Sequence, residues 1–231
     1  MHPILCKIGP FTIYTYGFCV FLGVLAGYAI ASKEAKRVGI KYDDFSDIFF
    51  WSLIFSFLGA RLLYILVEFK DFLTNPLNMI FARAGFVFFG GVVGGLTTIY
   101  LLTRRKNINF LKYSDIIILG VPLGHAFGRI GCFFYGCCYG KLEAVFPIQL
   151  ISACGLFVIF VTFWILRRRK KFDGALVFAY LITYGLFRFI IEFFRQDPRG
   201  YVEFLSTSQI FSIFSIIAGA FLYFKNSRKH Y

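Results

Sequence analysis

The sequence is poor in charged residues, and poorest in acids. Only 16% of its 231 residues are charged and only 12 are acidic, whereas 58% are apolar. A soluble domain is typically about 25% charged and 45–50% apolar. The composition therefore excludes a soluble globular domain, a disordered chain and a collagen-like chain, and an integral membrane protein remains.

The sequence also lacks long polar stretches. A spanning helix needs about 17–25 mostly apolar residues. Seven segments qualify: 11–32, 46–67, 85–103, 114–136, 148–167, 174–194 and 208–224. The connections are too short for a soluble domain, and we find no internal repeat. We predict an all-α polytopic membrane protein, a single domain over residues 1–231 with seven transmembrane helices.

Lys and Arg outnumber the acids, with 25 basic residues and a net charge of +13. A basic excess can indicate nucleic-acid binding, but here it follows the helix connections. The connections 33–45, 104–113 and 167–173 and the C-terminal tail hold 16 Lys and Arg, and the alternate stretches, including 195–207, hold six. Because Lys and Arg concentrate in cytoplasmic loops, we predict an outer N-terminus, a cytoplasmic C-terminus and no nucleic-acid partner.

Three arginines are not explained by topology, because they lie inside apolar spans: Arg61, Arg129 and Arg188. A central Arg costs about 2.5–3.5 kcal/mol on insertion scales and usually faces a cavity or a partner. Only one acid lies similarly deep, Glu192, on the same helix face as Arg188. The excess positive charge predicts an anion, and guanidinium groups fit phosphate oxygens. The residues suggest a cavity for a phospholipid head group.

Glycines interrupt the fourth apolar span. Gly128, Gly131, Gly136 and Gly140 lie close together beside Arg129, and glycine disfavours an ordinary helix. We expect a broken helix or a re-entrant segment that lines a cavity, where backbone N–H groups can bind phosphate. Other small-residue faces, such as Gly23 with Gly27, are typical of close helix packing.

This segment resembles the signature of bacterial prolipoprotein diacylglyceryl transferases, Gly-Arg-x-Gly-Asn-Phe-x-Asn-x-Glu-x-x-Gly. The matching residues are Gly128, Arg129, Gly131, Phe133 and Gly140. Further similarities to family motifs are found at Tyr16-Gly17, Gly59-Ala60-Arg61, Gly90-Gly91, Pro147, Gln149, Tyr184-Gly185, Arg188, Glu192 to Arg195, and Gln209. The resemblance covers nearly the whole chain, and the family shares the seven-helix topology.

The resemblance implies a reaction. Members of the family move the diacylglyceryl group of phosphatidylglycerol onto the lipobox cysteine of a prolipoprotein signal peptide and release glycerol phosphate. The implied location is the bacterial cytoplasmic (inner) membrane, among membrane lipid, and neither a cofactor nor a metal is expected.

The resemblance also implies roles for particular residues. Arg129 and Arg188 would neutralise the leaving phosphate, supported by Arg61 and Glu192, and Tyr16 would contact the lipid or the attacking thiol. The glycines expected to complete the phosphatidylglycerol site are Gly128, Gly131, Gly140, Gly90 and Gly91.

The chain departs from the family pattern at the expected proton acceptor. The family's His before Gly-Gly is Phe89 here, and a phenyl ring cannot accept a proton. His125, the only histidine outside the chain ends, can substitute as a catalytic base or can be structural.

The signature also carries cysteines in this chain. Cys132, Tyr135 and Cys137 replace its Asn and Glu residues, Cys138 follows, and the connection 137–147 is short. The cysteines can serve packing, form a disulfide, bind a metal or take part in catalysis. Their spacing matches no common zinc pattern.

Two other functions are compatible with the sequence. One is a related lipid-modifying membrane enzyme that uses another acceptor or a cysteine nucleophile. The other is an anion or lipid transporter, since broken glycine-rich helices occur in transporters. The absence of repeat symmetry between the halves argues against the transporter.

Overall fold

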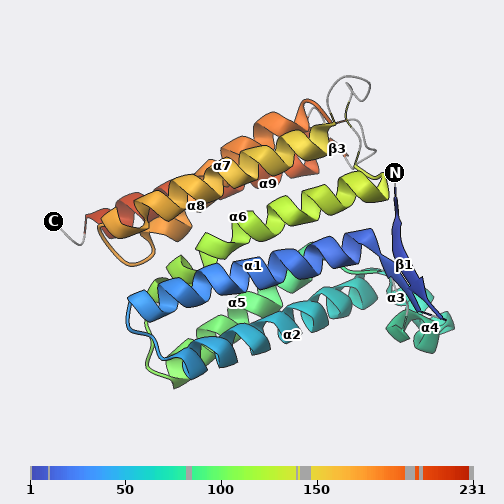
Figure 1. Cartoon of the computed structure of the whole chain (residues 1–231), viewed down its shortest axis with the longest axis horizontal. Helices are drawn as coiled ribbons and strands as arrows, with labels where there is room; N and C mark the ends of the chain where they lie inside the picture. The colour runs from blue at the N-terminus through green and yellow to red at the C-terminus, as the bar shows by residue number, and fades with distance from the viewer. Residues whose placement is uncertain are drawn as a thin grey trace. The chain divides into compact units, whose positions relative to one another are not determined.

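The computed structural model is mostly helical (Figure 1) and describes residues 2–9, 11–81, 85–138, 140, 147–195, 201–202 and 205–228. Four of the basic residues counted for topology lie outside these ranges: Arg83, Lys141, Arg199 and Lys229. The chain divides into two compact units. Unit 1 comprises Met1–Lys33 and Ser114–Tyr231, and unit 2 comprises Glu34–Tyr113.

Unit 1 is built on five long helices and two small strand pairs. The helices are α1 (Thr15–Arg37), α6 (Phe110–Tyr135), α7 (Ile148–Leu166, continued by the 3-10 turn η1, Arg167–Arg169), α8 (Ala175–Glu192) and α9 (Thr207–Ser227). Strand β1 (Ile4–Ile8) pairs antiparallel with β2 (Phe11–Tyr14), and β3 (Tyr201–Val202) pairs antiparallel with β4 (Leu205–Ser206).

Glycines allow α1 and α6 to cross closely. A Cβ at Gly120 would lie 2.6 Å from the carbonyl oxygen of Gly27, and a Cβ at Gly23 would lie 3.0 Å from that of Gly124. Small residues permit this backbone approach between membrane helices. The packing interpretation of Gly23 and Gly27 is thus confirmed.

The core of unit 1 lies between α6, α7 and α8. Its buried members are Leu119, Ile159, Phe163, Leu176 and Tyr180. Helix α9 packs along α8, where a Cβ at Gly185 would lie 3.0 Å from the carbonyl oxygen of Ser212. The helices that carry Arg129, Arg188 and Glu192 are therefore held by contacts within unit 1.

Unit 2 contains α2 (Tyr42–Val67), α3 (Phe69–Thr74), α4 (Pro76–Phe81) and α5 (Phe88–Arg105). Helices α2 and α5 pack side by side. At Gly59, Gly90 and Gly94 the two backbones approach so closely that a Cβ would collide with the facing carbonyl group.

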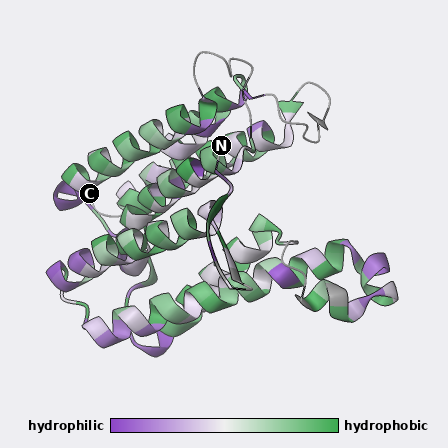
Figure 2. Cartoon of the chain, turned by 45° about the vertical axis from the view of Figure 1, so that its right-hand side comes forward, coloured by the Kyte–Doolittle hydropathy of each residue, from purple (hydrophilic) through white to green (hydrophobic). Residues whose placement is uncertain are grey.

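Six described helices are long and apolar enough to cross a membrane: α1, α2, α6, α7 with η1, α8 and α9. Many large apolar side chains on them are exposed, such as Phe57 and Phe214. Figure 2 shows hydrophobic residues along the helices and hydrophilic residues mainly near their ends. These features are those of a multi-pass membrane protein.

The predicted spans are all helical, with two corrections. The first helix begins at Thr15 rather than residue 11, because residues 11–14 form β2. The fourth span is not broken at Gly128, since α6 continues to Tyr135. Helical glycine costs only about 1 kcal/mol, and close packing at Gly131 offsets it. Of the expected re-entrant segment, Gly128 to Gly140, residue 139 lies outside the described residues.

Candidate functional site

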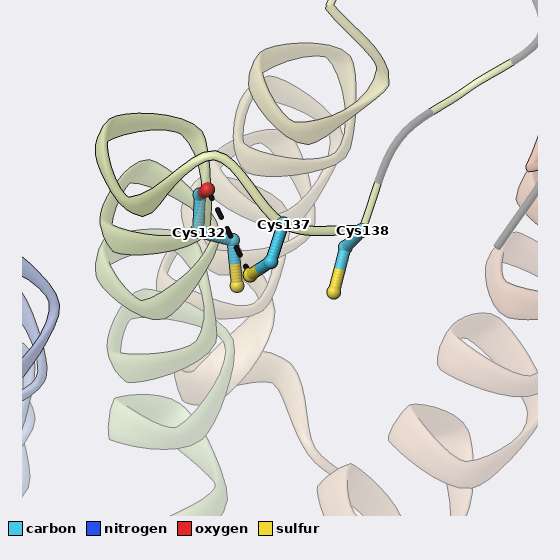
Figure 3. Close-up of side chains that lie close together, drawn as sticks. All are labelled: Cys132, Cys137 and Cys138. Atoms are coloured by element: carbon cyan, nitrogen blue, oxygen red, sulfur yellow. Dashed lines mark hydrogen bonds between the residues drawn. The ribbon is translucent and has the colours of Figure 1, made fainter. Parts of the chain in front are cut away.

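Helix α6 ends in a turn that brings cysteines together. Gly136 has a left-handed backbone (φ 80°), and the N–H groups of Gly136 and Cys137 donate to the carbonyl oxygen of Cys132 at 3.0 and 3.2 Å. A left-handed glycine commonly ends a helix. Cys138 is also left-handed (φ 64°), which is uncommon for a residue with a Cβ. The turn places Cys137 and Cys138 beside the end of α6 (Figure 3).

The thiol groups of these three cysteines form a cluster. The Sγ atoms of Cys132, Cys137 and Cys138 all lie within 4.8 Å of one another, and none is in a disulfide. Figure 3 shows all three sulfur atoms below the turn in that view. Gln149, near the start of α7, donates to the carbonyl oxygen of Cys137 at 3.0 Å. The turn is therefore held from both α6 and α7.

The surroundings favour the thiolate form at one of the cysteines. The pKa of the Cys138 thiol is lowered to about 5, chiefly by a hydrogen bond from the Cys132 thiol, with further help from the charge and hydrogen bond of Arg195. The pKa of the neighbouring Cys137 thiol is raised, mainly by burial. Thiolates are the reactive and metal-binding form of cysteine.

Tyr16 lies in the first turn of α1, against the last turns of α6. Gly131 permits this approach, since a Cβ there would lie 3.1 Å from Cys19 Cβ and 3.3 Å from Tyr16 Cα. The Tyr16 ring meets the Tyr135 ring edge to face, with centroids 6.4 Å apart. The Tyr16 hydroxyl lies within electrostatic range of Arg129 and of the three clustered cysteines.

Arg129 lies near the end of α6 and is half-buried. In the described part of the chain, no residue hydrogen-bonds or forms an ion pair with its guanidinium. Its charge acts on Tyr16, Cys132 and Arg188. The adjacent Gly128 has nothing within 4 Å of its Cβ position, so the backbone there borders open space.

Arg188 and Glu192 form an ion pair near the end of α8. Arg188 Nη2 lies 2.9 Å from Glu192 Oε2, and the two side chains are 13% and 6% exposed. Arg188 Nη2 also donates to Ser208 Oγ at 3.1 Å. Arg188 Nη1 is buried without a hydrogen-bond partner among the described residues. The described residues thus hold one terminal nitrogen of this guanidinium and not the other.

Ser206 ties the start of α9 to this ion pair. Its Oγ donates to Glu192 Oε1 at 3.0 Å and accepts from the N–H of Gln209 at 3.2 Å. Gln209 Oε1 accepts from the N–H of Ser206 at 3.0 Å, which completes a capping box. The pattern Ser-x-x-Gln is a sequence signature of such a cap. It is the feature from which the position of Ser206 at the start of α9 could have been predicted. No pattern pointed to Ser208.

Arg195 lies in the connection after α8, as predicted, but it is buried there. It is 7% exposed and forms an isolated antiparallel bridge with Gly140. A Cβ at Gly140 would lie 2.9 Å from Ile148 Cβ. Gly140 therefore permits close packing beside the cysteine turn, and Arg195 reaches Cys138.

His125 lies one helical turn before Arg129. Its Nδ1 is 3.4 Å from the Tyr180 hydroxyl, and its ring centroid is 5.6 Å from that of Tyr184. The ring therefore joins α6 to α8.

Arg61 belongs to unit 2 and is satisfied there. Its Nη1 donates to the carbonyl oxygen of Gly85 at 2.8 Å, and its Nη2 donates to that of Met79. Its guanidinium also lies over the Phe86 ring, 5.2 Å from the centroid. These contacts join α2 to Met79 of α4 and to Gly85 and Phe86, and a role in lipid binding stays a prediction.

Gly90 and Gly91 also lie in unit 2, on the face of α5 that packs on α2. A Cβ at Gly91 would lie 3.3 Å from the carbonyl oxygen of Ser56, and Gly90 faces Gly59 more closely still. Their expected role in phosphatidylglycerol binding likewise stays a prediction.

Comparison with known proteins reveals similarity over nearly the full length. Residues 3–225 match the family described as prolipoprotein diacylglyceryl transferase. The phosphatidylglycerol–prolipoprotein diacylglyceryl transferase of Clostridium tetani is 37% identical, with 96% of this chain and 97% of that protein covered. Similarly named proteins of Clostridium perfringens and Finegoldia magna are each 34% identical, with 99% of this chain and 97% of each relative covered.

Proposed function

Because the chain belongs to the prolipoprotein diacylglyceryl transferase family, we propose that it transfers the diacylglyceryl group of phosphatidylglycerol to the lipobox cysteine thiol of prolipoproteins. The products are a thioether-linked lipid and glycerol phosphate. The chain is thus a multi-pass membrane transferase whose partners are the lipid and the prolipoprotein signal peptide.

The chemistry sets three requirements. The sulfur displaces a phosphate from an sp³ carbon of the glycerol backbone, so the enzyme must bind the lipid, stabilise the leaving phosphate and provide a thiolate. Preorganised cations and hydrogen-bond donors at the developing charge are the most effective way to meet the second requirement.

The observation that carries the proposal is the pair of incompletely satisfied guanidinium groups of Arg129 and Arg188. Arg129 has no protein partner among the described residues, and Arg188 keeps Nη1 without one. Their charges lie within electrostatic range of each other. A phosphate placed between them would receive charge-assisted hydrogen bonds from both and would relieve their repulsion.

Glu192 is a positioning residue in this proposal. It orients Arg188 through the ion pair and is itself held by Ser206. A carboxylate that binds only one edge of the guanidinium leaves the opposite edge for phosphate oxygens.

Tyr16 is proposed to contact the attacking thiol or the lipid. Its hydroxyl lies within range of Arg129 and the cysteine turn. Gly128 is proposed to border the bound lipid, since its surroundings are open. Gly131 and Gly140 are proposed to shape the site by permitting the close approach of Tyr16 and Phe194.

His125 is one candidate for the proton acceptor, because it is a histidine within an apolar span. Its contacts with Tyr180 and Tyr184 support a role in packing α6 against α8, so we expect His125→Ala to retain transfer. A loss of transfer of about 100-fold, as expected for removal of a general base, would instead restore its catalytic assignment.

Arg61, Gly90 and Gly91 are proposed to bind lipid within unit 2. Arg61 donates hydrogen bonds to the carbonyl oxygens of Gly85 and Met79, and Gly90 and Gly91 lie on the glycine face of α5.

We propose that residues 1–231 form one domain with seven membrane-spanning helices. Helix α5 corresponds to the predicted span 85–103, which completes the seven. It has 18 residues, but its four glycines and its terminal Arg104 and Arg105 lower its hydropathy. The alternation of basic connections supports an outer N-terminus and a cytoplasmic C-terminus in the bacterial inner membrane. The ends of α6 and α8 then face outward, where a secreted prolipoprotein arrives.

A second candidate function is favoured by Phe89. A phenyl ring stands where the family has a histidine, and three clustered cysteines lie at the proposed site. A related lipid-modifying reaction with a different acceptor is compatible with this change.

Reconstitution distinguishes the two functions. The full chain in vesicles with labelled phosphatidylglycerol and a lipobox peptide is expected to add a diacylglyceryl group to the peptide cysteine, detected by mass. A peptide with Ser in place of the lipobox Cys is the control. Absence of transfer, under conditions where a His-bearing relative is active, would reject the first function.

A further inference from the structure

The cysteine cluster has no role in the reaction as described so far. Three Sγ atoms from one turn converge within 4.8 Å, beside the arginines proposed to bind phosphate. We propose that Cys132, Cys137 and Cys138 bind a zinc ion whose fourth coordination position receives the acceptor thiol. The zinc site itself can be tested alone, while its catalytic role rests on the proposed function.

The donor set suits zinc. Thiolate sulfur is a soft ligand that selects zinc among the common divalent cations. Tetrahedral zinc with Zn–S bonds of about 2.3 Å separates its sulfur atoms by about 3.8 Å. The Sγ atoms already lie within 4.8 Å of one another, so small side-chain rotations bring them to that spacing.

The backbone around the cluster is arranged to hold it. Cys138 keeps a left-handed backbone at φ 64° although it carries a Cβ. Such a conformation is unfavourable for a residue with a Cβ and persists where the surrounding structure maintains it. Here Gln149 binds the carbonyl oxygen of Cys137, and Gly136 supplies the preceding left-handed turn. The spacing of the three cysteines in the sequence matches no common zinc pattern. In those patterns a loop separates two pairs of ligands, whereas here the turn at the end of α6 brings the sulfur atoms together.

Three protein ligands indicate an open position. Structural zinc sites are closed by four protein ligands, whereas catalytic sites use three and leave the fourth to water or substrate. In the described part of the chain, the group contains three cysteines and no fourth Cys, His, Asp or Glu. The Tyr16 hydroxyl lies within electrostatic range of all three.

The charges around the cluster match this assignment. Zinc with three thiolates has a net negative charge, which increases when a substrate thiolate binds. Arg195 hydrogen-bonds to Cys138, and the charge of Arg129 acts on Cys132 and Cys137. These cations stabilise an anionic complex, and Arg129 links it to the phosphate site.

The site supplies the activation that Phe89 cannot. A thiol that coordinates zinc is deprotonated outright, and metal coordination activates nucleophiles. The substrate sulfur then forms a bond to the glycerol carbon of phosphatidylglycerol while the carbon–oxygen bond to phosphate breaks. The leaving oxygen takes the bonding electron pair. The proton released by the thiol is balanced by the proton that the glycerol phosphate monoester takes up.

The first test measures zinc in the purified full chain, under reducing conditions, by elemental mass spectrometry. We expect about one zinc per chain, as for a single tetrahedral site. Cys132→Ser, Cys137→Ser and Cys138→Ser are each expected to lose it, since even a lost second-sphere contact weakens metal binding by about 10–100-fold. Cys154→Ser, which alters an exposed cysteine of α7, is the matched control and should keep the zinc.

The second test replaces zinc by cobalt, because the intensity of the sulfur-to-cobalt charge-transfer absorption reports the number of sulfur ligands. Addition of the lipobox peptide should increase that absorption, because a fourth sulfur binds, and the Ser-for-Cys peptide should not. This measurement uses the wild-type chain and therefore does not depend on the folding of any cysteine variant. Chelation should abolish transfer, and added zinc should restore it.

The outcomes separate the metal site from the reaction. Transfer by a chain that contains no zinc and resists chelation would reject the metal site and leave the proposed function intact. A mass lower by two hydrogens without bound zinc would identify a disulfide and also reject it. Stoichiometric zinc without transfer would support the site and reject the proposed function. An unchanged cobalt spectrum with the lipobox peptide would reject the open position.

Discussion

Arg188 and Glu192 pair at 2.9 Å near the end of α8, with side chains only 13% and 6% exposed. The pair neutralises one of the two arginines of the candidate site and leaves Arg129 without a partner in the described part of the chain. The site therefore carries a net positive charge before substrate binds. A phosphodiester would neutralise it, which gives lipid binding an electrostatic contribution that a neutral head group lacks.

The Arg188–Glu192 pair yields the first prediction. Removal of one member of a buried ion pair typically costs about 3–5 kcal/mol, because it leaves a buried charge uncompensated. We expect Glu192→Gln to be destabilised by a comparable amount in neutral or zwitterionic detergent. Phosphatidylglycerol should stabilise this variant more than the wild type, since its phosphate supplies the missing negative charge. Thermal unfolding with phosphatidylglycerol or with diacylglycerol, which lacks the phosphate, measures both effects.

An exposed carboxylate provides the matched control for that measurement. Glu68, at the end of α2, is exposed, and Glu68→Gln should unfold like the wild type with either lipid. Equal stabilisation of Glu192→Gln and wild type by phosphatidylglycerol would contradict the neutralisation of Arg188 by phosphate.

Arg129 yields the second prediction. Loss of one preorganised donor to a developing oxyanion typically lowers kcat by about 10²–10³-fold, and we expect Arg129→Ala to fall in that range. Arg129→Lys should recover part of the activity, because it keeps the charge but loses bidentate geometry. Arg168→Ala, at an exposed basic residue, is the control. Near-normal transfer by Arg129→Ala would exclude the proposed phosphate role.

The helices were predictable because the membrane imposes their length. Every apolar run of sufficient length became a helix, and the apolar pattern did not depend on distant contacts. The exceptions are local. Residues 11–14 are as apolar as the helix that follows, and only their pairing with β1 makes them a strand. The glycines of α6 reduce helix propensity, but contacts at Gly131 with α1 maintain the helix.

The candidate site was only partly predictable. Arg129, Arg188 and Glu192 stood out because charge inside an apolar span is costly. The proximity of Cys138 to Cys132 depends on the left-handed residues Gly136 and Cys138 on either side of Cys137, which no periodic pattern indicates. Arg195 lies in the connection after α8, as the end of the apolar run predicts, but the pattern did not indicate that it is buried beside Gly140.

Gly131 yields the third prediction. A Cβ there would lie 3.3 Å from the Tyr16 backbone, so Gly131→Ala should move α1 slightly and displace the Tyr16 hydroxyl. We expect reduced transfer with little change in stability, because the helix gains about 0.5–1 kcal/mol from alanine. Gly17→Ala brings the same helical gain with nothing within 4 Å of the new Cβ and should remain active. Full activity of Gly131→Ala would argue against a role for this contact.

Asp115 yields the last prediction, at the other end of α6. Its buried carboxylate accepts hydrogen bonds from the N–H groups of Gly174, Leu176 and Val177 at 2.9–3.1 Å and pairs with Lys170 at 3.0 Å. It therefore caps the start of α8 from another helix.

Asp115→Ala leaves these buried donors unsatisfied, at a typical cost of about 1–3 kcal/mol for each group that is left without a partner. We expect a large drop in the midpoint of thermal unfolding, with kcat preserved below the transition because the proposed phosphate site lies at the opposite end of the helix. Asp173→Ala removes the more exposed partner of the same Lys170 and should have a much smaller effect, since surface ion pairs contribute about 0–1 kcal/mol. Equal destabilisation by the two variants would show that the cap at Asp115 contributes no more than a surface ion pair.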